Sequence, residues 1–235
     1  MERNITVSIL PVLIIMLKTP IIIVNLKTYM QGYGKNALAL AKALEDVGEG
    51  KVAIAASALD LNILVNNTNL PILAQHIDPI KYGSNTGFIL PEGVKESGAI
   101  GTLVNHSEHR LKLADIEACI KRAKELDLIT VLCTNNIQTS KAGATLEPDF
   151  VAVEPPELIG GDISVSKAQP EIIKGSVDLV KKVAPNVKVL CGAGVKNGED
   201  VRIAMELGAE GVLLASGVVK AKDSKSVMKD LISGI

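Results

Sequence analysis

The chain contains no tryptophan and few other aromatic residues. Its 235 residues include three tyrosines and two phenylalanines, so aromatic residues make up 2% of a sequence that is 47% hydrophobic. The core therefore has to be built from Val, Ile, Leu and Ala. That composition is typical of parallel strands that helices bury on both faces.

The sequence also lacks an excess of charge of either sign. It has 25 Lys and Arg residues against 26 Asp and Glu residues, which gives a formal net charge of -1. Because no long-range field would attract nucleic acid or an anionic membrane surface, we expect neither as a partner. An anionic ligand has to be bound by local groups instead.

Cysteine is scarce as well. Cys119, Cys133 and Cys191 are an odd number, widely spaced and without a CxxC or histidine-rich pattern. This spacing supports neither a disulfide framework nor a zinc site. We expect a reducing, cytoplasmic environment, no metal, and structural roles for Cys133, Cys191 and His76.

A hydrophobic run long enough to cross a membrane is missing too. The opening segment MERNITVSILPVLII has one short apolar run, which Pro11 interrupts, and no small-residue cleavage site follows it. It is too short to span a bilayer and does not look like a secretory signal. Since Met16 begins MLKTPIIIVNLK, which is typical of a natural start, we expect residues 1–15 to be a dispensable extension and residues 16–235 to form one domain.

Short runs rich in β-branched residues alternate with segments of helical periodicity along the chain. We expect strands at 20–26, 52–56, 72–75, 100–105, 129–133, 150–154, 187–191 and 211–215. We expect helices at 36–47, 59–66, 92–97, 107–126, 138–144, 170–184, 199–207 and 224–232. Gly48, Gly208 and Pro185 mark the ends of three helical runs.

This alternation predicts an α/β fold, a single closed (β/α)8 barrel with some shortened helices, which typically takes ~250 residues but can be built from about 200. A doubly wound open sheet is the alternative. It would normally carry a glycine-rich dinucleotide loop after its first strand. Here Asn25-Leu26-Lys27 stands there, and the glycine cluster CGAGVKNG at 191–198 lacks the GxGxxG spacing. The pattern favours the barrel.

Polar and small residues follow several of the expected strands. In such barrels the carboxyl ends of the strands converge on one mouth, where the chemistry takes place. The residues there are Asn25 and Lys27 after the first strand, His106 and Glu108 after the fourth, Glu154 at the end of the sixth, Gly194 after the seventh, and Ala215 and Ser216 after the eighth. A carboxylate, an imidazole, an ammonium and two small-residue loops would face a common pocket.

The motifs at these positions resemble those of the triosephosphate isomerase family, and in particular its short archaeal form. NLK is similar to the family's Asn-x-Lys motif, NHSEHR to its His-Ser-Glu motif, and VEPPELIGG to its catalytic glutamate and mobile loop, while AQHIDP and ASGVV resemble the archaeal branch. The resemblance runs from about Ile21 to the C-terminus. It implies a TIM barrel that interconverts dihydroxyacetone phosphate and D-glyceraldehyde 3-phosphate without metal or organic cofactor, in glycolysis and gluconeogenesis.

The resemblance implies a role for each motif residue. Glu154 would be the base, His106 the electrophile and Lys27 the cation that stabilises developing charge. Asn25 would help to hold the site, and Glu108 would orient Lys27. These roles suit the chemistry, because an enediolate intermediate needs a carboxylate to take the carbon-bound proton and donors to hold the negative oxygen.

The surroundings of His106 are expected to keep its ring uncharged. A helix that starts at Ser107 would direct the positive end of its dipole at the imidazole, which disfavours the imidazolium form. The neutral ring and the ammonium of Lys27 could then hold the developing oxyanion together.

A phosphate group would be bound by backbone N–H groups in glycine-rich turns. Such barrels often build this site after strands seven and eight. The candidates are Gly194, Ala215 and Ser216, with the loop residues Ile159, Gly160 and Gly161 expected to close over the phosphate.

Two departures from the family pattern lie near this site. The loop has Gly160-Gly161-Asp162 where members usually have Gly-Thr-Gly, so a hydroxyl is missing and an acid is added. We expect a less stable closed state as a result. His109 stands where many members have arginine, and we expect it on the surface.

Other functions stay open at this point. Another phosphate-binding barrel, such as a sugar-phosphate isomerase or an aldolase, would keep the glycine loops, but a Schiff-base aldolase would want a lysine where Glu154 stands. A barrel that binds a phosphorylated metabolite or acts as an oligomeric scaffold has no use for Glu154, His106 and Lys27 together.

The resemblance also implies partners. The segment KYGSNTGF at 81–88 resembles the loop by which family members reach into a neighbouring subunit, with Thr86 and Gly87 as the residues of interest. We therefore expect a homo-oligomer, a tetramer as in the short archaeal form, with a small triose phosphate as the substrate.

Overall fold

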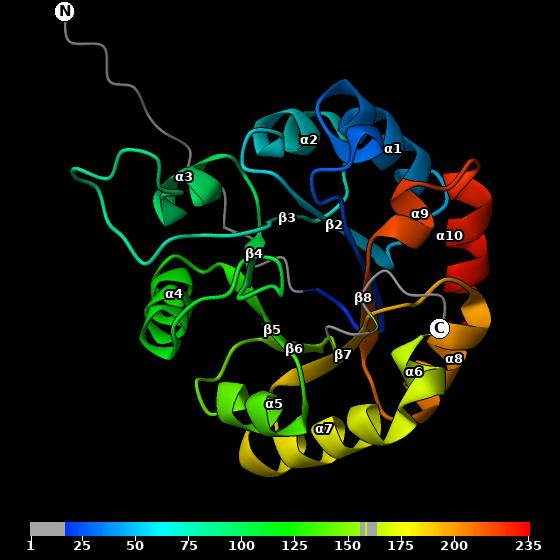
Figure 1. Cartoon of the computed structure of the whole chain (residues 1–235). Helices are drawn as coiled ribbons and strands as arrows, with labels where there is room; N and C mark the ends of the chain where they lie inside the picture. Colours follow the sequence, from blue (N-terminus) through cyan, green and yellow to red (C-terminus); the bar gives the residue numbers. More distant parts are fainter. Residues whose placement is uncertain (1–16, 156–157, 159–163) are drawn as a thin grey trace, which may run out of the picture.

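Eight parallel strands form a closed barrel in the computed structural model, which describes residues 17–155, 158 and 164–235 (Figure 1). The strands are β1 (Ile21–Asn25), β2 (Val52–Ala56), β3 (Ile72–Ala74), β4 (Gly101–Val104), β5 (Ile129–Thr134), β6 (Phe150–Val153), β7 (Lys188–Gly192) and β8 (Gly211–Leu214). Each strand pairs with its neighbours in sequence, and β1 closes the barrel against β8, with Ile21 opposite Gly211 and Val24 opposite Leu214. The α/β barrel predicted from the sequence is confirmed.

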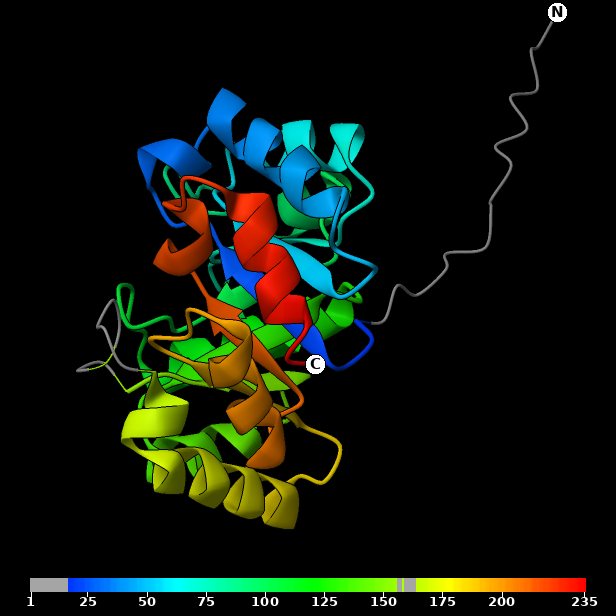
Figure 2. The same cartoon turned by 90° about the vertical axis from the view of Figure 1, so that its right-hand side faces the viewer.

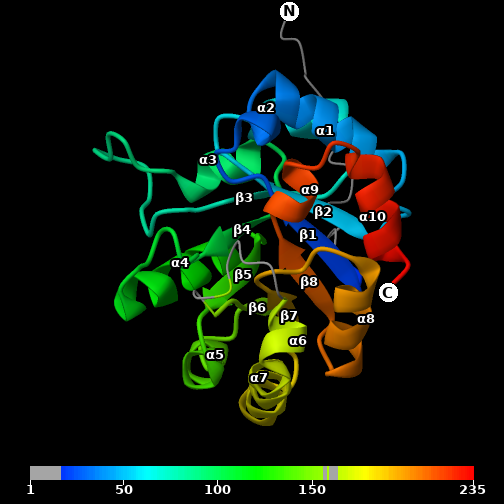
Figure 3. The same ribbon diagram turned by 45° about the vertical axis from the view of Figure 1, so that its right-hand side comes forward.

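Helices surround the strands. They are α1 (Lys35–Glu45), α2 (Leu61–Asn67), α3 (Pro91–Glu96), α4 (Leu113–Glu125), α5 (Ile137–Ala144), α6 (Val165–Ala168), α7 (Pro170–Val183), α8 (Gly198–Glu206), α9 (Ser216–Val219) and α10 (Ser224–Ile232), with a 3-10 helix η1 at Met30–Gly32. The helices α5, α6 and α7 lie together on one side of the barrel (Figure 3). The last helix, α10, packs between α1 and α8 and completes the outer layer (Figure 2).

The strands are buried on both faces. In β1, the side chains of Ile21 and Ile23 belong to a cluster made mostly of strand residues, which fills the barrel interior. The side chains of Ile22 and Val24 belong to a second cluster, which they share with the helices. Because successive side chains of a strand point to opposite faces, both faces need apolar residues. This explains why the strands are continuous runs of Val, Ile, Leu and Ala.

One predicted helix start is wrong. The helix expected from Ser107 begins at Leu113. Before it, Oδ1 of Asn105 accepts the N–H of Leu111 (2.9 Å), and the Arg110 guanidinium donates to the backbone oxygen of Asn105 (3.0 Å). These bonds hold the segment in a turn, because they take up groups that a helix would pair otherwise. The short elements η1, α6 and α9 were not predicted, since three or four residues show no periodicity.

Some sequence predictions fall outside the described residues. They are the extension at residues 1–15 and the loop residues Ile159, Gly160, Gly161 and Asp162. The domain boundary at residue 15 and the phosphate contacts of the loop therefore stay predictions. Within the described residues, no helix combines the length and the hydropathy that crossing a bilayer requires.

Candidate active site

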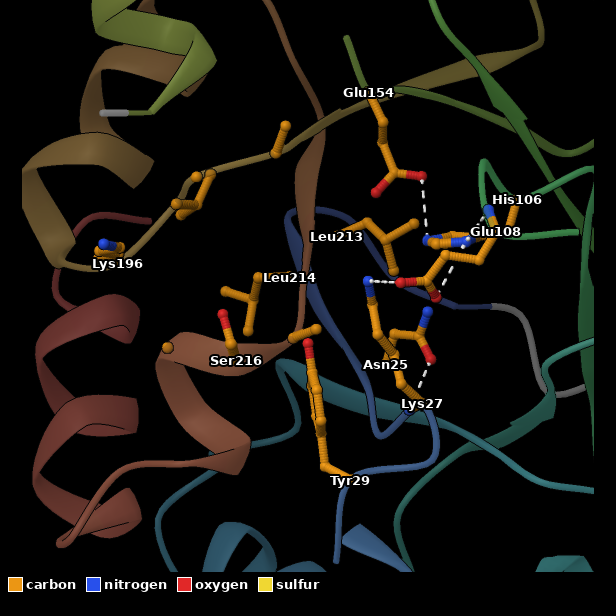
Figure 4. A pocket seen from close by; sticks show the side chains of 15 residues that line it. Asn25, Lys27, Tyr29, His106, Glu108, Glu154, Lys196, Leu213, Leu214 and Ser216 are labelled. Carbon is orange, nitrogen blue, oxygen red and sulfur yellow. Dashed lines mark hydrogen bonds and ion pairs between the residues drawn. The ribbon is translucent and has the colours of Figure 1, made fainter. Parts of the chain in front are cut away.

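A cavity of about 150 Å³ lies at the carboxyl ends of the strands (Figure 4). Every predicted site residue in the described part of the chain lines it, namely Asn25, Lys27, His106, Glu108, Glu154, Gly194, Ala215 and Ser216. The strands β1, β4, β6, β7 and β8 bring these residues together from distant parts of the sequence. The parallel barrel explains this convergence, because all its strands end at the same mouth.

Glu154 and His106 face each other across one side of the cavity (Figure 4). The Nε2 atom of His106 lies 3.7 Å from Oε2 of Glu154, and the two residues are only 7% and 5% exposed. Oε2 of Glu154 is buried and has no hydrogen-bond partner among the described residues. A buried carboxylate oxygen that is left unpaired is available to accept a proton from a bound molecule.

The hydrogen bonding of His106 indicates which ring nitrogen carries the proton. Nδ1 accepts the backbone N–H of Glu108 at 3.2 Å. In the neutral ring the proton is then on Nε2, which faces Glu154. Protonation of Nδ1 would lose this bond. The carboxylate of Glu108 lies 3.6 Å from the same nitrogen and is 58% exposed.

The helix start that was predicted directly after His106 lies at Leu113 instead. The helix dipole that the sequence suggested has no role at His106, because α4 begins at Leu113 rather than at Ser107. The effect of a helix dipole fades within the first turn. The backbone N–H of Glu108, rather than a helix N-terminus, is the group that contacts Nδ1 of His106.

Lys27 is held at both ends. Its Nζ lies 2.7 Å from Oε1 of Glu108, while its backbone N–H donates to Oδ1 of Asn25 at 3.0 Å. Its φ of 50° is in the left-handed region, which is uncommon for a residue with a side chain. The Asn–x–Lys pair at the end of β1 is thus a local turn whose asparagine fixes the backbone from which the ammonium extends.

Left-handed backbone recurs at other strand ends around the cavity. Asn105 after β4 has a φ of 61°, and Ala193 after β7 has a φ of 67°. Non-glycine residues in this region cost of order 1–3 kcal/mol each and persist where the surroundings hold them, which is often at functional sites. Together with Lys27, these residues turn the chain sharply at the mouth of the barrel.

The opposite side of the cavity is made of small residues. Gly194, Ala215 and Ser216 lie there, with Ser216 across the cavity from His106 in Figure 4. Sequence reasoning missed Tyr29 and Lys196, which also line the cavity. Each stands two residues after a motif residue, Tyr29 after Lys27 and Lys196 after Gly194, and that proximity was the available signal.

Asp200 anchors the loop that carries Gly194 and Lys196. Its Oδ2 accepts the backbone N–H of Lys196 (3.0 Å), its Oδ1 accepts the hydroxyl of Ser164 (3.0 Å), and Lys167 lies 2.9 Å away. Burial alone would raise the pKa of this carboxyl, but the bonds from Lys167, Lys196 and Ser164 outweigh it and hold the pKa below its ordinary value. The ionised carboxylate fixes the loop to α6.

Two further residues have local environments that the sequence did not reveal. The Cys133 thiol is buried, and both burial and the nearby charge of Glu154 raise its pKa, so it stays protonated. His109 is exposed, as predicted, and its ring centroid lies 4.2 Å from that of buried His76.

Within the described residues, no group of His, Cys, Asp or Glu side chains is arranged so that it could bind a metal ion.

Comparisons with known proteins agree on one family. The family profile described as triosephosphate isomerase matches residues 20–233. The triosephosphate isomerase of Methanothermus fervidus is 56% identical over 217 residues, which cover 91% of this chain and 98% of that protein. That of Methanocaldococcus jannaschii is 54% identical over 218 residues, covering 92% of this chain and all of the relative (100%).

A solved structure supports the fold. The crystal structure of triosephosphate isomerase from Bartonella henselae has a TM-score of 0.73 to this chain and covers 91% of it, with 99% of that chain matched. The two sequences are 18% identical, so this likeness bears on the fold alone.

Proposed function

The chain belongs to the triosephosphate isomerase family, and from this premise we propose how its cavity interconverts dihydroxyacetone phosphate and D-glyceraldehyde 3-phosphate. The observation that carries the proposal is the pairing of Glu154 with His106. A buried, unpartnered carboxylate oxygen lies 3.7 Å from a ring nitrogen that can donate a proton. A three-carbon substrate that lies against both groups would meet a base and a proton donor side by side.

In this mechanism Glu154 removes a proton from carbon 1 of dihydroxyacetone phosphate. The electron pair of the broken C–H bond forms the carbon–carbon double bond of the enediolate, and the carbonyl electrons move to oxygen. Nε2–H of His106 and the ammonium of Lys27 hold that negative oxygen. Protons then move between the two oxygens, and Glu154 returns its proton to carbon 2, which leaves the aldehyde at carbon 1.

The phosphate of the substrate is assigned to the other side of the cavity. Gly194, Ala215 and Ser216 present small side chains there, which let backbone N–H groups approach a dianion closely. Asp200 supports this side, since it fixes the backbone of Lys196. The two ends of the substrate would thus be held by different strands, with β1, β4 and β6 around the reacting carbons and β7 and β8 around the phosphate.

A coupled assay with D-glyceraldehyde 3-phosphate tests the proposal. Glu154→Asp withdraws the carboxylate by one methylene, and we expect kcat to fall by about 10²-fold or more, since displacement of a reacting group by ~1 Å costs that much. Binding of a phosphate-bearing inhibitor should stay nearly unchanged. Glu117→Asp, at an exposed position on α4, is the matched control and should keep full activity. Near-normal kcat in Glu154→Asp would show that Glu154 is not the base, and well-folded protein without turnover would favour a binding barrel.

We further propose that the chain forms a homo-oligomer through residues 79–88, which we call the arm (Figure 1). Asp78 and Ile89 close its base, because the N–H of Asp78 donates to the oxygen of Ile89 (3.0 Å) and the N–H of Ile89 donates to Oδ2 of Asp78 (2.6 Å). Tyr82 and Phe88 on the arm are 67% and 57% exposed. Exposed aromatic side chains of this kind are enriched at protein interfaces.

A second cavity offers a place for the arm of another copy. Its volume is about 610 Å³, and it shares Lys27, His106 and Glu108 with the first cavity. We propose that the tip of a neighbour's arm, with Thr86 and Gly87, enters it and covers one side of the catalytic groups. The tetramer predicted from the archaeal resemblance would then combine two such pairs.

We propose a cytoplasmic location. Cys119, Cys133 and Cys191 are free and buried, and burial raises the pKa of the Cys119 thiol to about 12. Free thiols suit a reducing compartment. Fractionation of cells that make the protein tests this, and recovery outside the cytoplasm would contradict it.

A further inference from the structure

Gln75 lies beside the catalytic groups without contacting the first cavity. It follows β3, and its side-chain amide reaches back to β1 and β2. Nε2 of Gln75 donates to Oδ1 of Asn25 (3.1 Å) and to the backbone oxygen of Lys27 (3.0 Å), with the backbone oxygen of Ala55 at 3.4 Å. Three acceptor oxygens from two strand ends therefore converge on one amide group.

These hydrogen bonds hold the backbone of Lys27 in place. This residue has a φ of 50°, which is unfavourable for a side chain and persists only where neighbours hold it. Its N–H is held by Asn25, and its C=O is held by Gln75. Since Gln75 also binds the same Asn25 oxygen, the peptide groups on both sides of the Lys27 Cα are tied to one network.

The direction of the ammonium follows from this backbone. Rotation of φ at Lys27 would move its side chain away from the cavity. The other contact of the ammonium is weak, because Glu108 is more than half exposed and binds Lys27 by a single ion pair. A flexible lysine held only by an exposed carboxylate is a weakly fixed cation. The hydrogen bonds of Asn25 and Gln75 fix the backbone from which the Lys27 side chain extends.

We propose that Gln75 is a positioning residue for the isomerase reaction, which it serves by holding Lys27 in the left-handed conformation that directs its ammonium into the cavity. This inference rests on the proposed role of Lys27. Gln75 acts as a donor, so a side chain of similar shape without N–H groups should lose the effect. The loss should appear in catalysis more than in folding.

Gln75→Met removes the donors and keeps the approximate length of the side chain. We expect kcat/KM to fall about tenfold to a hundredfold, because a displaced catalytic group costs up to about 10²-fold per ångström. Gln75→Glu should be at least as damaging, since a carboxylate would face three acceptor oxygens. Gln138→Met, at an exposed position on α5, is the matched control and should keep wild-type kinetics.

A double-mutant cycle with Lys27→Ala separates positioning from a merely structural role. If Gln75 acts through Lys27, Gln75→Met should cause little further loss of kcat/KM once Lys27 is alanine. An equal loss in both backgrounds would overturn the inference and leave the proposed function standing. Full activity of Lys27→Ala would overturn the role of Lys27 and the inference together.

A crystal structure of Gln75→Met gives a second measurement that does not depend on turnover. We expect the φ of Lys27 to leave the left-handed region and its Nζ to move away from Glu108. An unchanged Lys27 backbone would overturn the inference. If Gln75→Met does not fold, Gln75→Asn replaces it, since it keeps the N–H donors but moves them away from their acceptors by one methylene. The double-mutant cycle and the crystal structure of this variant should give the same results.

Discussion

Gly192 leaves the space in which the side chain of Glu154 lies. A methyl group at position 192 would overlap Cγ of Glu154 and lie 3.0 Å from its Cδ and 3.1 Å from its Oε1. The two residues are close because β6 and β7 pair, with Val153 opposite Cys191. The carboxylate therefore passes over the end of the neighbouring strand on its way to the cavity.

The first prediction follows from this contact. Gly192→Ala should push the Glu154 carboxylate out of position, and we expect kcat to fall by about 10²-fold, since a shift of ~1 Å costs that much. Kinetics in the coupled assay measure this. Gly93→Ala on α3, where an added methyl group meets nothing within 4 Å, is the control and should leave kcat unchanged. Unaltered kcat in Gly192→Ala would argue against the observed position of Glu154 as the reactive one.

A second prediction concerns the imidazole. His106→Ala removes the Nε2 donor and leaves the N–H of Glu108 without its acceptor. We expect kcat to fall by about 10²- to 10³-fold, as when one donor to a developing oxyanion is lost. The affinity for a phosphate-bearing inhibitor should change far less, because the phosphate side of the cavity is untouched. Retention of wild-type kcat would exclude His106 as the electrophile.

A third prediction links stability to pH through His76. Burial, opposed by the hydrogen bond to Asp78, lowers its pKa from the ordinary value of 6.5. The unfolded chain therefore takes up a proton before the folded chain does, so the free energy of unfolding should fall as the pH drops below about 6.5. Urea unfolding at several pH values measures this slope. His76→Asn should make the slope shallower, and an identical slope in both proteins would contradict the assignment.

A fourth prediction concerns the arm. Replacing Tyr82 and Phe88 by serine removes the exposed aromatic surface, and we expect a shift to smaller species in light scattering, with lower activity at low protein concentration. The monomer should stay folded, because both side chains are mostly exposed. Val183→Ser, which removes a partly exposed apolar side chain at the end of α7, serves as the control. A fully active monomer would count against any role for the arm.

A fifth prediction concerns the N-terminus. A chain that begins at Met16 should fold with the same melting temperature and show the same kcat and KM as the full chain. The family profile starts at residue 20, and the chain segment before β1 contributes Leu17 to the buried cluster of the barrel interior. A lower melting temperature or lost activity in the shortened protein would show that residues 1–15 contribute to the fold.

The barrel could be predicted in detail because its signals are local. The bounds of β2 and α10 match the expected ranges 52–56 and 224–232 at both ends, since runs of β-branched residues and helical periodicity identify such elements without knowledge of their neighbours. The start of α4 could not be predicted in the same way. Its position depends on the side-chain bonds of Asn105, which only form once the turn itself exists.

The site was predictable in part for a similar reason. Glu154, His106 and Lys27 stand in motifs whose order can be recognised in the sequence. Gln75 and Gly192 stand in the quoted segments AQHIDP and CGAGVKNG, but they act through contacts with residues of other strand ends, and no spacing in the sequence records those contacts. A signal for Gln75 did exist, because it is a polar residue directly after a buried strand, like the motif residues that were identified.

The pairing of β1 with β8 has a consequence for how the protein is made. Lys27 leaves the ribosome well before the strand that closes the barrel beside it, in which Leu214 lies opposite Val24. The catalytic groups cannot be enclosed while the chain is still growing through its middle. During synthesis the early strands therefore need protection from aggregation until β8 emerges.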